Sequence, residues 1–146
     1  MRLVVQRVQS AKVIIENREY SVIKQGLLCF VGFCDSDTSV DFEWAVNKIK
    51  TIKIFNNNKS SLEDLGLELM IVSQFTLFAS IKKGTKPSWS KAAAPELAES
   101  LYNDFIKTCE NHILNPIKTG VFGSDMQIDL INDGPLTLLI DTKQKE

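Results

Sequence analysis

The sequence predicts a single α/β domain, in which an antiparallel-rich mixed sheet is built in layers and two main helices cover one face, giving a three-layer α/β/β arrangement. Three observations support this prediction. The 146 residues are the length of one domain. Strand patterns occupy both ends of the chain, as β-branched segments near the N-terminus and as apolar/polar alternation near the C-terminus. Two stretches with apolar residues at helical spacing lie between them, so we treat residues 1–146 as one domain.

The N-terminal part of the chain predicts a meander of hairpins. Short segments rich in β-branched residues lie at residues 3–8, 12–16 and 20–23. Gln9-Ser10 and Asn17-Arg18 separate them and are typical of turns. Gly26 then opens the run 27–31, which is apolar on both faces and predicts a central strand of the sheet.

Two amphipathic helices are predicted. The first follows Asp37, and its apolar side chains fall at helical spacing: Phe42, Ala45, Val46, Ile49 and Ile52. The second begins with Pro95, which suits the first helical position, and ends near His112. Its predicted apolar stripe contains Leu97, Leu101, Phe105 and either Thr108 or Cys109.

Further strands are predicted in the rest of the chain. A polar loop over residues 56–61 precedes a long apolar segment, 67–78, which predicts a buried strand. Residues 126–131 alternate between apolar and polar side chains, and residues 136–140 predict a final strand. The tail 142–146 is expected to be frayed.

Composition and charge exclude several classes of protein. Hydrophobic residues make up 44% and charged residues 24% of the chain, which is ordinary for a globular domain and excludes disorder. The 17 basic and 18 acidic residues leave a formal charge of −1, so a nucleic acid would have to be met by a local patch. The longest apolar run, 27–33, is too short to cross a membrane. The N-terminus has no signal-peptide pattern, so we expect a cytoplasmic protein with no membrane partner.

The sequence predicts neither a metal site nor a cofactor. It has three cysteines and one histidine and no CxxC pair, which are too few soft ligands for zinc. The odd number of cysteines, two of them in or beside apolar stretches, favours reduced structural thiols. His112 lies at the polar end of the second helix, away from the motifs below, and is predicted to be a surface residue rather than a catalytic base.

Ser73, Gln74, Phe75 and Thr76 form the first candidate site. Three hydrogen-bonding side chains stand here in an otherwise apolar segment, where an unpaired polar group costs on the order of 1–3 kcal/mol. In a regular strand Gln74 and Thr76 share one face and can point into one pocket. The alternative is that these groups satisfy the backbone of a neighbouring loop.

The segment Asn132-Asp133-Gly134-Pro135 is the second candidate. Asp-Gly is a hairpin signal, whereas a following proline removes a hydrogen-bond donor from the returning strand. One interpretation is a tight turn at the edge of the sheet. The other is that Gly134, which has no Cβ, exposes peptide carbonyls to a ligand next to a cis Gly134-Pro135 bond.

Two glycine-containing loops are candidates for contact with a nucleic acid. The first carries four lysines around Gly84, namely Lys82, Lys83, Lys86 and Lys91. These lysines are either a solvated cluster or ligands of phosphates. In the second loop, 119–126, two glycines flank Phe122, whose ring either packs in the core or stacks on a base.

Together these motifs resemble the D-aminoacyl-tRNA deacylase family, collinearly over nearly the whole chain. The resemblance rests on Gln6-Arg7-Val8, Ser73-Gln74-Phe75-Thr76-Leu77, the loop from Gly84 to Trp89 with Pro95, Leu101-Tyr102 and Phe105, then Thr119-Gly120, Phe122-Gly123, Asp125-Met126 and Asn132-Asp133-Gly134-Pro135-Leu136-Thr137. The two longest signatures stand in the expected order and at the expected separation, which makes the resemblance specific.

The resemblance implies a homodimer, with its active site at the interface, that hydrolyses the ester joining a D-amino acid, or glycine, to the terminal adenosine of tRNA. It implies catalytic roles for Ser73, Gln74, Phe75 and Thr76. A cis Gly134-Pro135 dipeptide is implied to enter the partner's pocket and exclude L side chains, with Arg7 holding its orientation. Substrate contacts are implied for Phe122, Gly123, Met126, Ala93, Lys82, Lys83 and Lys86.

Three features depart from the family's pattern. The loop 56–61 is shorter than the family's and lacks its Gly-Lys-Met-Asn stretch, Trp89 stands where Phe is common, and Ser124 stands where Ala or Gly is common. These departures concern substrate contacts rather than the reaction.

The reaction implied by the resemblance needs no strong base. An aminoacyl ester is reactive, so a fixed geometry with backbone N–H groups aimed at the developing oxyanion can suffice. Water helped by the ribose hydroxyl of the substrate is the first mechanism, and covalent attack by Thr76 is the second. Two other functions stay open: an L-alanyl-tRNA editing deacylase of the same fold, and a tRNA- or nucleic-acid-binding module without catalysis.

Overall fold

The computed structural model describes residues 1–145. In chain order, the elements of this part are β1 (Arg2–Ile15), β2 (Arg18–Ile23), β3 (Gly26–Gly32), α1 (Ser39–Thr51), α2 (Leu62–Leu65), β4 (Glu68–Ser73), the 3₁₀-helix η1 (Phe75–Phe78), α3 (Pro95–His112), β5 (Lys118–Thr119) and β6 (Gln127–Asp141).

The strands join one mixed sheet in the order β2-β1-β3-β4-β5, with β6 also paired to β1. β1 is antiparallel to β2, β3 and β6, whereas β3-β4 and β4-β5 are parallel. The predicted antiparallel-rich mixed sheet is therefore confirmed. β3 lies in its centre, and every residue of β3 except Phe30 is buried, as the run of apolar residues predicted.

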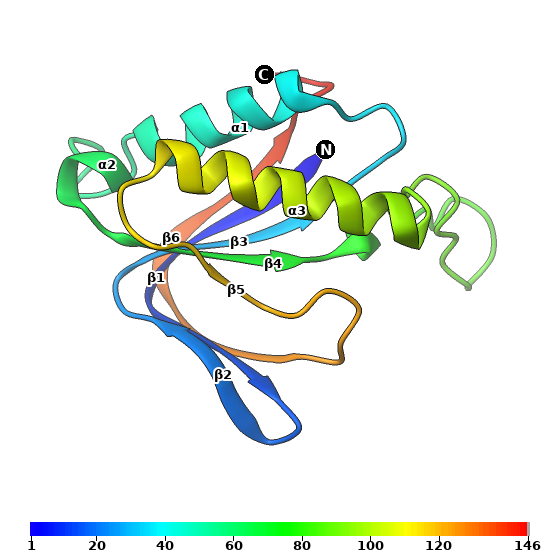
Figure 1. Ribbon diagram of the computed structural model, residues 1–146, viewed down its shortest axis with the longest axis horizontal. Coiled ribbons are helices and arrows are strands. Elements are labelled where there is room, and N and C mark those ends of the chain that lie inside the picture. The colour runs from blue at the N-terminus through cyan, green and yellow to red at the C-terminus, as the bar shows by residue number, and fades with distance from the viewer. Residues whose placement is uncertain (146) are drawn as a thin grey trace.

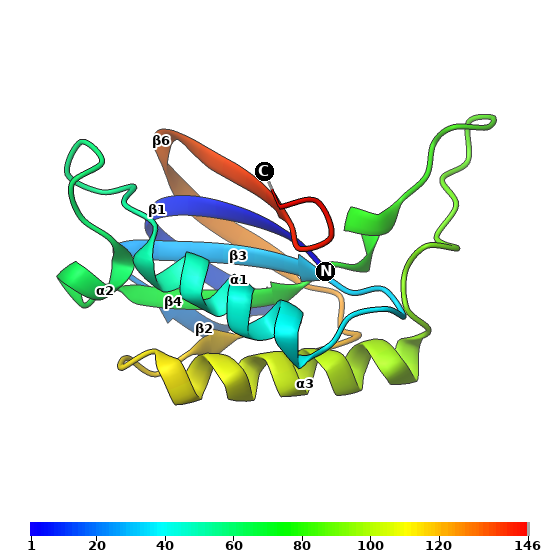
Figure 2. The ribbon, with the colours of Figure 1, turned by 90° about the horizontal axis from the view of Figure 1, so that it is seen from above.

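Two apolar cores give the molecule its layers. Figures 1 and 2 show α1 and α3 on the same face of the sheet, while β2 and the adjoining half of β1 turn away from the helices. On the helix side, the rings of Phe33, Phe42 and Phe105 meet at centroid distances between 5.7 and 6.2 Å. A second buried cluster, which includes Val13 and Met70, lies on the other side of the sheet. The α/β fold with two main helices on one face is thus confirmed.

β1 is one continuous strand, so its predicted division into two hairpin segments was wrong. Gln9 and Ser10 lie inside it, and its pairing with β6 shifts register on both sides of Val8. Such bulges bend a strand and increase its twist, which lets one strand take part in both layers. The turn instead falls at Glu16 and Asn17, whose φ angles of 49° and 60° suit a two-residue hairpin.

β4 and β6 also differ from the prediction. The strand predicted over 67–78 ends at Ser73 and is followed by η1. The tight turn considered at residues 132–135 is not formed, because β6 runs through them as one strand. Asn132 lies opposite Val8 and Thr137 opposite Gln6, so four residues of β6 stand opposite Arg7 alone and bulge from the sheet.

The two predicted helices are confirmed. The N-terminus of α1 is capped by Asp41, whose carboxylate accepts the Thr38 backbone N–H at 2.9 Å. α3 begins at Pro95 and ends at His112, and its buried side chains are Ala98, Tyr102, Phe105 and Cys109. Leu97, which was predicted in this stripe, is 41% exposed. None of the helices within residues 1–145 is long and apolar enough to span a membrane.

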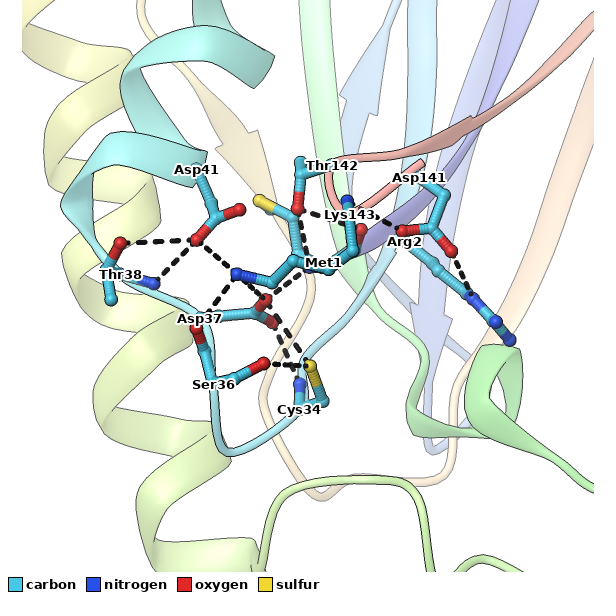
Figure 3. Close-up of polar contacts among 10 residues, drawn as sticks. All are labelled: Met1, Arg2, Cys34, Ser36, Asp37, Thr38, Asp41, Asp141, Thr142 and Lys143. Atoms are coloured by element: carbon cyan, nitrogen blue, oxygen red, sulfur yellow. Dashed lines mark hydrogen bonds and ion pairs between the residues drawn. The ribbon is translucent and has the colours of Figure 1, made fainter. Parts of the chain in front are cut away.

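The C-terminal residues are held against the start of β1, so the prediction of a frayed tail was wrong up to Lys143. Thr142 is buried, and its N–H donates to the Met1 carbonyl at 3.0 Å. Lys143 Nζ lies 2.7 Å from an Asp41 carboxylate oxygen, and the Met1 ammonium contacts Asp37 (Figure 3). Glu146 lies outside the described residues.

The three cysteines are free thiols, as predicted. Cys29 and Cys109 are buried, and burial raises the pKa of both thiols. They therefore pack as small apolar side chains.

Candidate functional site

The polar turn, residues 73–76, lies at the C-terminal end of β4. β4 runs parallel to β3, with Ser73 opposite Val31. The chain then leaves the sheet at Gln74, with φ −150° and ψ 80°, and Phe75 begins η1. The Gln74 N–H still donates to the Val31 carbonyl at 2.7 Å, and this last bond to β3 fixes the point at which the turn begins.

Gly32 allows the polar turn to fold back over the end of β3. A Cβ at Gly32 would lie 2.7 Å from the Gln74 carbonyl oxygen and 3.3 Å from Leu77 Cβ. The first distance is shorter than any real Cβ contact, so a larger residue would push the backbone of the turn away. This role was missed, because the only sequence signal is that Gly32 interrupts an apolar run.

Gln74 and Thr76 come together in the polar turn, although not by the strand alternation that was expected. The Gln74 side-chain amide donates to Thr76 Oγ1 at 2.5 Å. Within residues 1–145, no carboxylate, imidazole or amine forms a hydrogen bond with Thr76. The hydroxyl therefore has an amide beside it and no candidate general base.

Phe122 and Met126 belong to the segment that follows β5, beside the C-terminal half of β4. Thr119 lies opposite Ile71 of β4, so the residues that follow it pass beside the end of β4. A Cβ at Gly120 would lie 2.4 Å from Met126 Sδ, which shows that Gly120 makes room for this side chain. The half-buried Phe122 ring packs on Tyr102 at a centroid distance of 5.8 Å, so it has a core contact as well as an exposed part.

Tyr102, which packs against Phe122, also binds to β4. Its hydroxyl donates to the Ile71 carbonyl at 2.9 Å. Burial raises the pKa of Tyr102, with smaller contributions from Tyr20 and Cys109. The phenol is therefore a neutral hydrogen-bond donor that fixes α3 to β4.

Ala93 lies at the same edge of the sheet. It is buried, and its N–H donates to the Phe33 carbonyl, directly beyond β3, at 2.9 Å. The N-terminal end of α3 follows, and Figure 2 shows it at the same end of the molecule as η1.

The lysine arm, residues 80–91, projects from this end (Figure 2). Ser80 and Ser88 exchange two backbone hydrogen bonds of 2.9 Å at its base. Trp89 packs edge-on against Phe75 with 5.3 Å between ring centroids, and both rings are about half exposed. The four lysines of the arm are exposed. Positive charge and exposed aromatic rings therefore lie next to the polar turn.

Gly134 and Pro135 lie in the bulge of β6, where both are exposed and joined by a cis peptide bond. Arg7 holds the residue that precedes them. Its Nε donates to the Asp133 carbonyl at 3.1 Å and lies 2.8 Å from Asp133 Oδ2. Another guanidinium nitrogen donates to the Ile54 carbonyl. Arg7 thus fixes the base of the bulge to the sheet and to the segment after α1.

The short polar loop lies beside the bulge. Asn56, Asn57 and Asn58 all have positive φ angles, which asparagine tolerates better than most residues. These asparagines line a shallow groove together with Arg7 and Pro135. The loop 56–61, in which the sequence departs from the family's pattern, therefore lies next to the Gly134-Pro135 dipeptide.

Within the chain, the dipeptide and the polar turn are far apart. Gly134 lies in the bulge beside Arg7. Ser73 lies opposite Val31, which is opposite Leu3 of β1. Ser73 and Gly134 are thus separated by four residues along the strands, from Leu3 to Arg7 of β1, and by three strand spacings, from β4 to β6. These offsets amount to roughly 20 Å. The candidate residues therefore form two groups at opposite ends of the sheet.

His112 belongs to neither group. Its Nε2 lies 2.9 Å from a Glu43 carboxylate oxygen, and both side chains are exposed. This is the surface position that the sequence predicted. In the part of the chain that the structure describes, no group of three or more His, Cys, Asp and Glu side chains could hold a metal ion.

This fold is shared with proteins of known structure. The structure of the c-Myc DNA Unwinding Element Binding Protein superposes with a TM-score of 0.91 at 35% identity, covering 97% of this chain and 98% of that chain. The structure of a probable eukaryotic D-amino acid tRNA deacylase has a TM-score of 0.81 at 19% identity, covering 95% and 97% of the two chains. The second likeness shows a shared fold.

Sequence comparison identifies the family. Residues 4–141 match the family described as D-Tyr-tRNA(Tyr) deacylase. A relative from Cytophaga hutchinsonii, named D-aminoacyl-tRNA deacylase, is 48% identical over 150 residues, and the match covers 100% of both chains. The chain belongs to the D-Tyr-tRNA(Tyr) deacylase family.

Proposed function

We propose that this chain is a homodimeric hydrolase of D-aminoacyl-tRNA and glycyl-tRNA, acting in the cytoplasm, in which Gly134-Pro135 of one subunit enters the polar turn of the other. Family membership and the name of the Cytophaga relative support the ester hydrolysis. The observation that carries the cross-subunit site is the exposed dipeptide, which is held by Arg7 and Asp133 at the end of the sheet opposite to the polar turn.

A second copy of the chain fits the face of the sheet that carries the open half of β6. Leu139 is 74% exposed. It lies opposite Val4, which in turn lies opposite Phe30, so these three apolar side chains share one face away from the helices. An isologous dimer buries the same patch of both subunits and lets each one give a dipeptide and receive one.

The polar turn supplies donors for the reaction. The N–H groups of Phe75 and Thr76 stand in the first turn of η1, where they have no intrahelical acceptor. Such donors can stabilise the oxyanion that forms when water attacks the ester carbonyl. The bond between the carbonyl carbon and the ribose oxygen then breaks, and the ribose oxygen takes the proton that the water loses.

Chirality is proposed to be selected by exclusion. Peptide carbonyls of the incoming Gly134-Pro135 meet the α-amino group of the substrate and leave no room for an L side chain. The side chain of a D-amino acid points away from the dipeptide, so the site does not distinguish one D side chain from another. Glycine passes because it has no side chain to exclude.

The remaining candidate residues are proposed to hold the tRNA end. Phe122, Gly123, Met126 and Ala93 flank the terminal adenosine. Lys82, Lys83 and Lys86 of the lysine arm contact phosphates, which supply affinity without reading sequence.

A deacylation assay with matched D-tyrosyl-, L-tyrosyl- and glycyl-tRNA tests this function. We expect the D-tyrosyl and glycyl esters to be cleaved and the L-tyrosyl ester to stay intact. Cleavage of L-alanyl-tRNA with no action on D-tyrosyl-tRNA would favour the related editing activity. Equal binding of charged and uncharged tRNA without any cleavage would favour a nucleic-acid-binding module.

A further inference from the structure

Arg2 connects three segments that are distant in sequence. Its Nε donates to Asp141 Oδ2 at 2.9 Å, in an ion pair that Figure 3 shows at the end of β6. Its NH1 group donates to the Leu77 carbonyl at 3.0 Å. Its guanidinium carbon lies 4.8 Å from the centre of the Phe78 ring. One cation thus joins the start of β1, the end of β6 and η1.

The contact with Leu77 bears on the polar turn. The Leu77 N–H donates to the Gln74 carbonyl at 3.2 Å, so Leu77 binds Gln74 on one side and Arg2 on the other. A four-residue 3₁₀-helix is weak on its own, and its last carbonyls lack internal partners. Arg2 supplies such a partner. It thereby holds the C-terminal half of η1 next to the start of β1 and the end of β3.

We infer that Arg2 is a positioning residue for the deacylation reaction, which holds the polar turn in its reactive geometry through Leu77 and Phe78. This inference rests on the proposed function of residues 73–76. Arg2 is linked to Gln74 through Leu77, and among the described residues it forms no hydrogen bond with residues 73–76. The planar guanidinium is needed because it makes the ion pair, the carbonyl bond and the ring contact at once, which an ammonium group cannot do.

Kinetics of Arg2→Gln, compared with Arg18→Gln as a matched control, test the inference. Arg18 is an exposed arginine of β2, remote from η1. We expect Arg2→Gln to lower kcat for D-tyrosyl-tRNA by about tenfold or more while KM changes by less than about twofold, because a displaced turn harms the reaction rather than tRNA binding. Arg2→Lys should recover part of kcat, and Asp141→Asn should lose less than Arg2→Gln.

Trp89 fluorescence provides a second readout that does not depend on activity. In a Trp44→Phe background Trp89 is the one remaining tryptophan, and it packs on Phe75 of η1. We expect Arg2→Gln to raise acrylamide quenching of Trp89 at temperatures where the protein stays folded.

Two results would overturn the positioning role: a folded Arg2→Gln enzyme with the kcat of the Arg18→Gln control, or quenching of Trp89 equal to that of the parent. A parent protein that cleaves no D-aminoacyl-tRNA would instead reject the proposed function, and the quenching experiment would still decide whether Arg2 holds the turn.

Discussion

At the scale of single residues, the Thr76 hydroxyl of the polar turn has no hydrogen-bonding partner within residues 1–145 that could activate it. The Gln74 amide donates to it at 2.5 Å, and an amide cannot accept a proton at neutral pH. A threonine nucleophile needs an adjacent base. Thr76 is therefore better suited to orienting Gln74 and the substrate than to forming a covalent intermediate.

We predict that Thr76→Ala retains measurable turnover of D-tyrosyl-tRNA and that no aminoacyl-enzyme can be trapped in the parent protein. Rapid quenching followed by mass spectrometry of the intact chain measures the second point. An aminoacyl adduct on Thr76 would refute this view and establish covalent catalysis.

Gly32 affects the candidate site because it has no side chain. We predict that Gly32→Ala lowers kcat by about tenfold or more, because the new methyl group meets the Gln74 carbonyl and moves the polar turn. Steady-state kinetics and a thermal melt measure the two consequences separately.

Ile49→Val is the matched control for Gly32→Ala. Ile49 is a fully buried residue of α1, and the change costs about 0.5–1.5 kcal/mol of stability without touching the turn. It should lower the melting temperature and leave kcat unchanged. Equal kcat values for the two variants would mean that Gly32 matters for stability alone.

At the scale of elements, the lysine arm carries four positive charges and contains no acidic residue. In the part of the chain that the structure describes, Lys82, Lys83, Lys86 and Lys91 form none of the ion pairs between side chains. We predict that Lys82→Gln combined with Lys83→Gln weakens tRNA binding and reduces the slope of log affinity against log salt by about one unit per lost contact. Turnover at saturating tRNA should persist.

Lys48→Gln combined with Lys107→Gln, on the outer faces of α1 and α3, is the control with the same change in net charge. Its salt slope should equal that of the parent. If both double variants behave alike, the arm is a solvated loop, which is the alternative that the sequence left open.

The helices and the central strand could be predicted from the sequence because each depends on local periodicity. The apolar spacing from Phe42 to Ile49 and Pro95 at the first helical position are local signals, and both helices formed where expected. The long strands were predicted less well. Polar residues such as Gln9 and Ser10 suggest a turn, but in β1 they lie at bulges, which depend on pairing with β6.

The candidate site was only partly predictable for the same reason. Ser73 to Thr76 stand out because polar side chains interrupt an apolar segment. Their true conformation depends on Gly32 and Leu77, and hence on an approach between segments that no local pattern encodes. The pairing of Arg7 with Asp133 likewise joins residues 126 positions apart.

At the scale of the whole molecule, the chain is closed by a network of charges between its two ends and α1 (Figure 3). Burial opposes ionisation of Asp41, but hydrogen bonds from Lys143, Thr142 and Thr38 outweigh it and lower the pKa of the Asp41 carboxyl. A carboxyl whose pKa is lower in the folded state stabilises the fold above its unfolded pKa, near 4. This contribution is lost as the pH falls through the folded pKa.

We predict that acid lowers the melting temperature of the parent protein more steeply than that of Asp41→Asn. The variant should melt several degrees lower at neutral pH and approach the parent as the pH falls below about 4, because the carboxyl of the unfolded parent takes up a proton there while the folded carboxyl stays charged. Asp104→Asn, at an exposed position of α3, serves as the control. Parallel pH profiles for parent and Asp41→Asn would exclude this role of the network.

The central claim concerns a site shared by two subunits, and complementation between two inactive variants tests it most directly. One variant, Ser73→Ala with Gln74→Ala, lacks two polar side chains of the polar turn. The other, Gly134→Leu, carries a side chain that would fill the partner's pocket. Each is expected to be inactive alone. Because a mixed dimer has one site with both wild-type parts, co-refolding equal amounts should restore about a quarter of the parent's D-tyrosyl-tRNA deacylation. A mixture as inactive as its components, although mixed dimers form, would contradict a cross-subunit site.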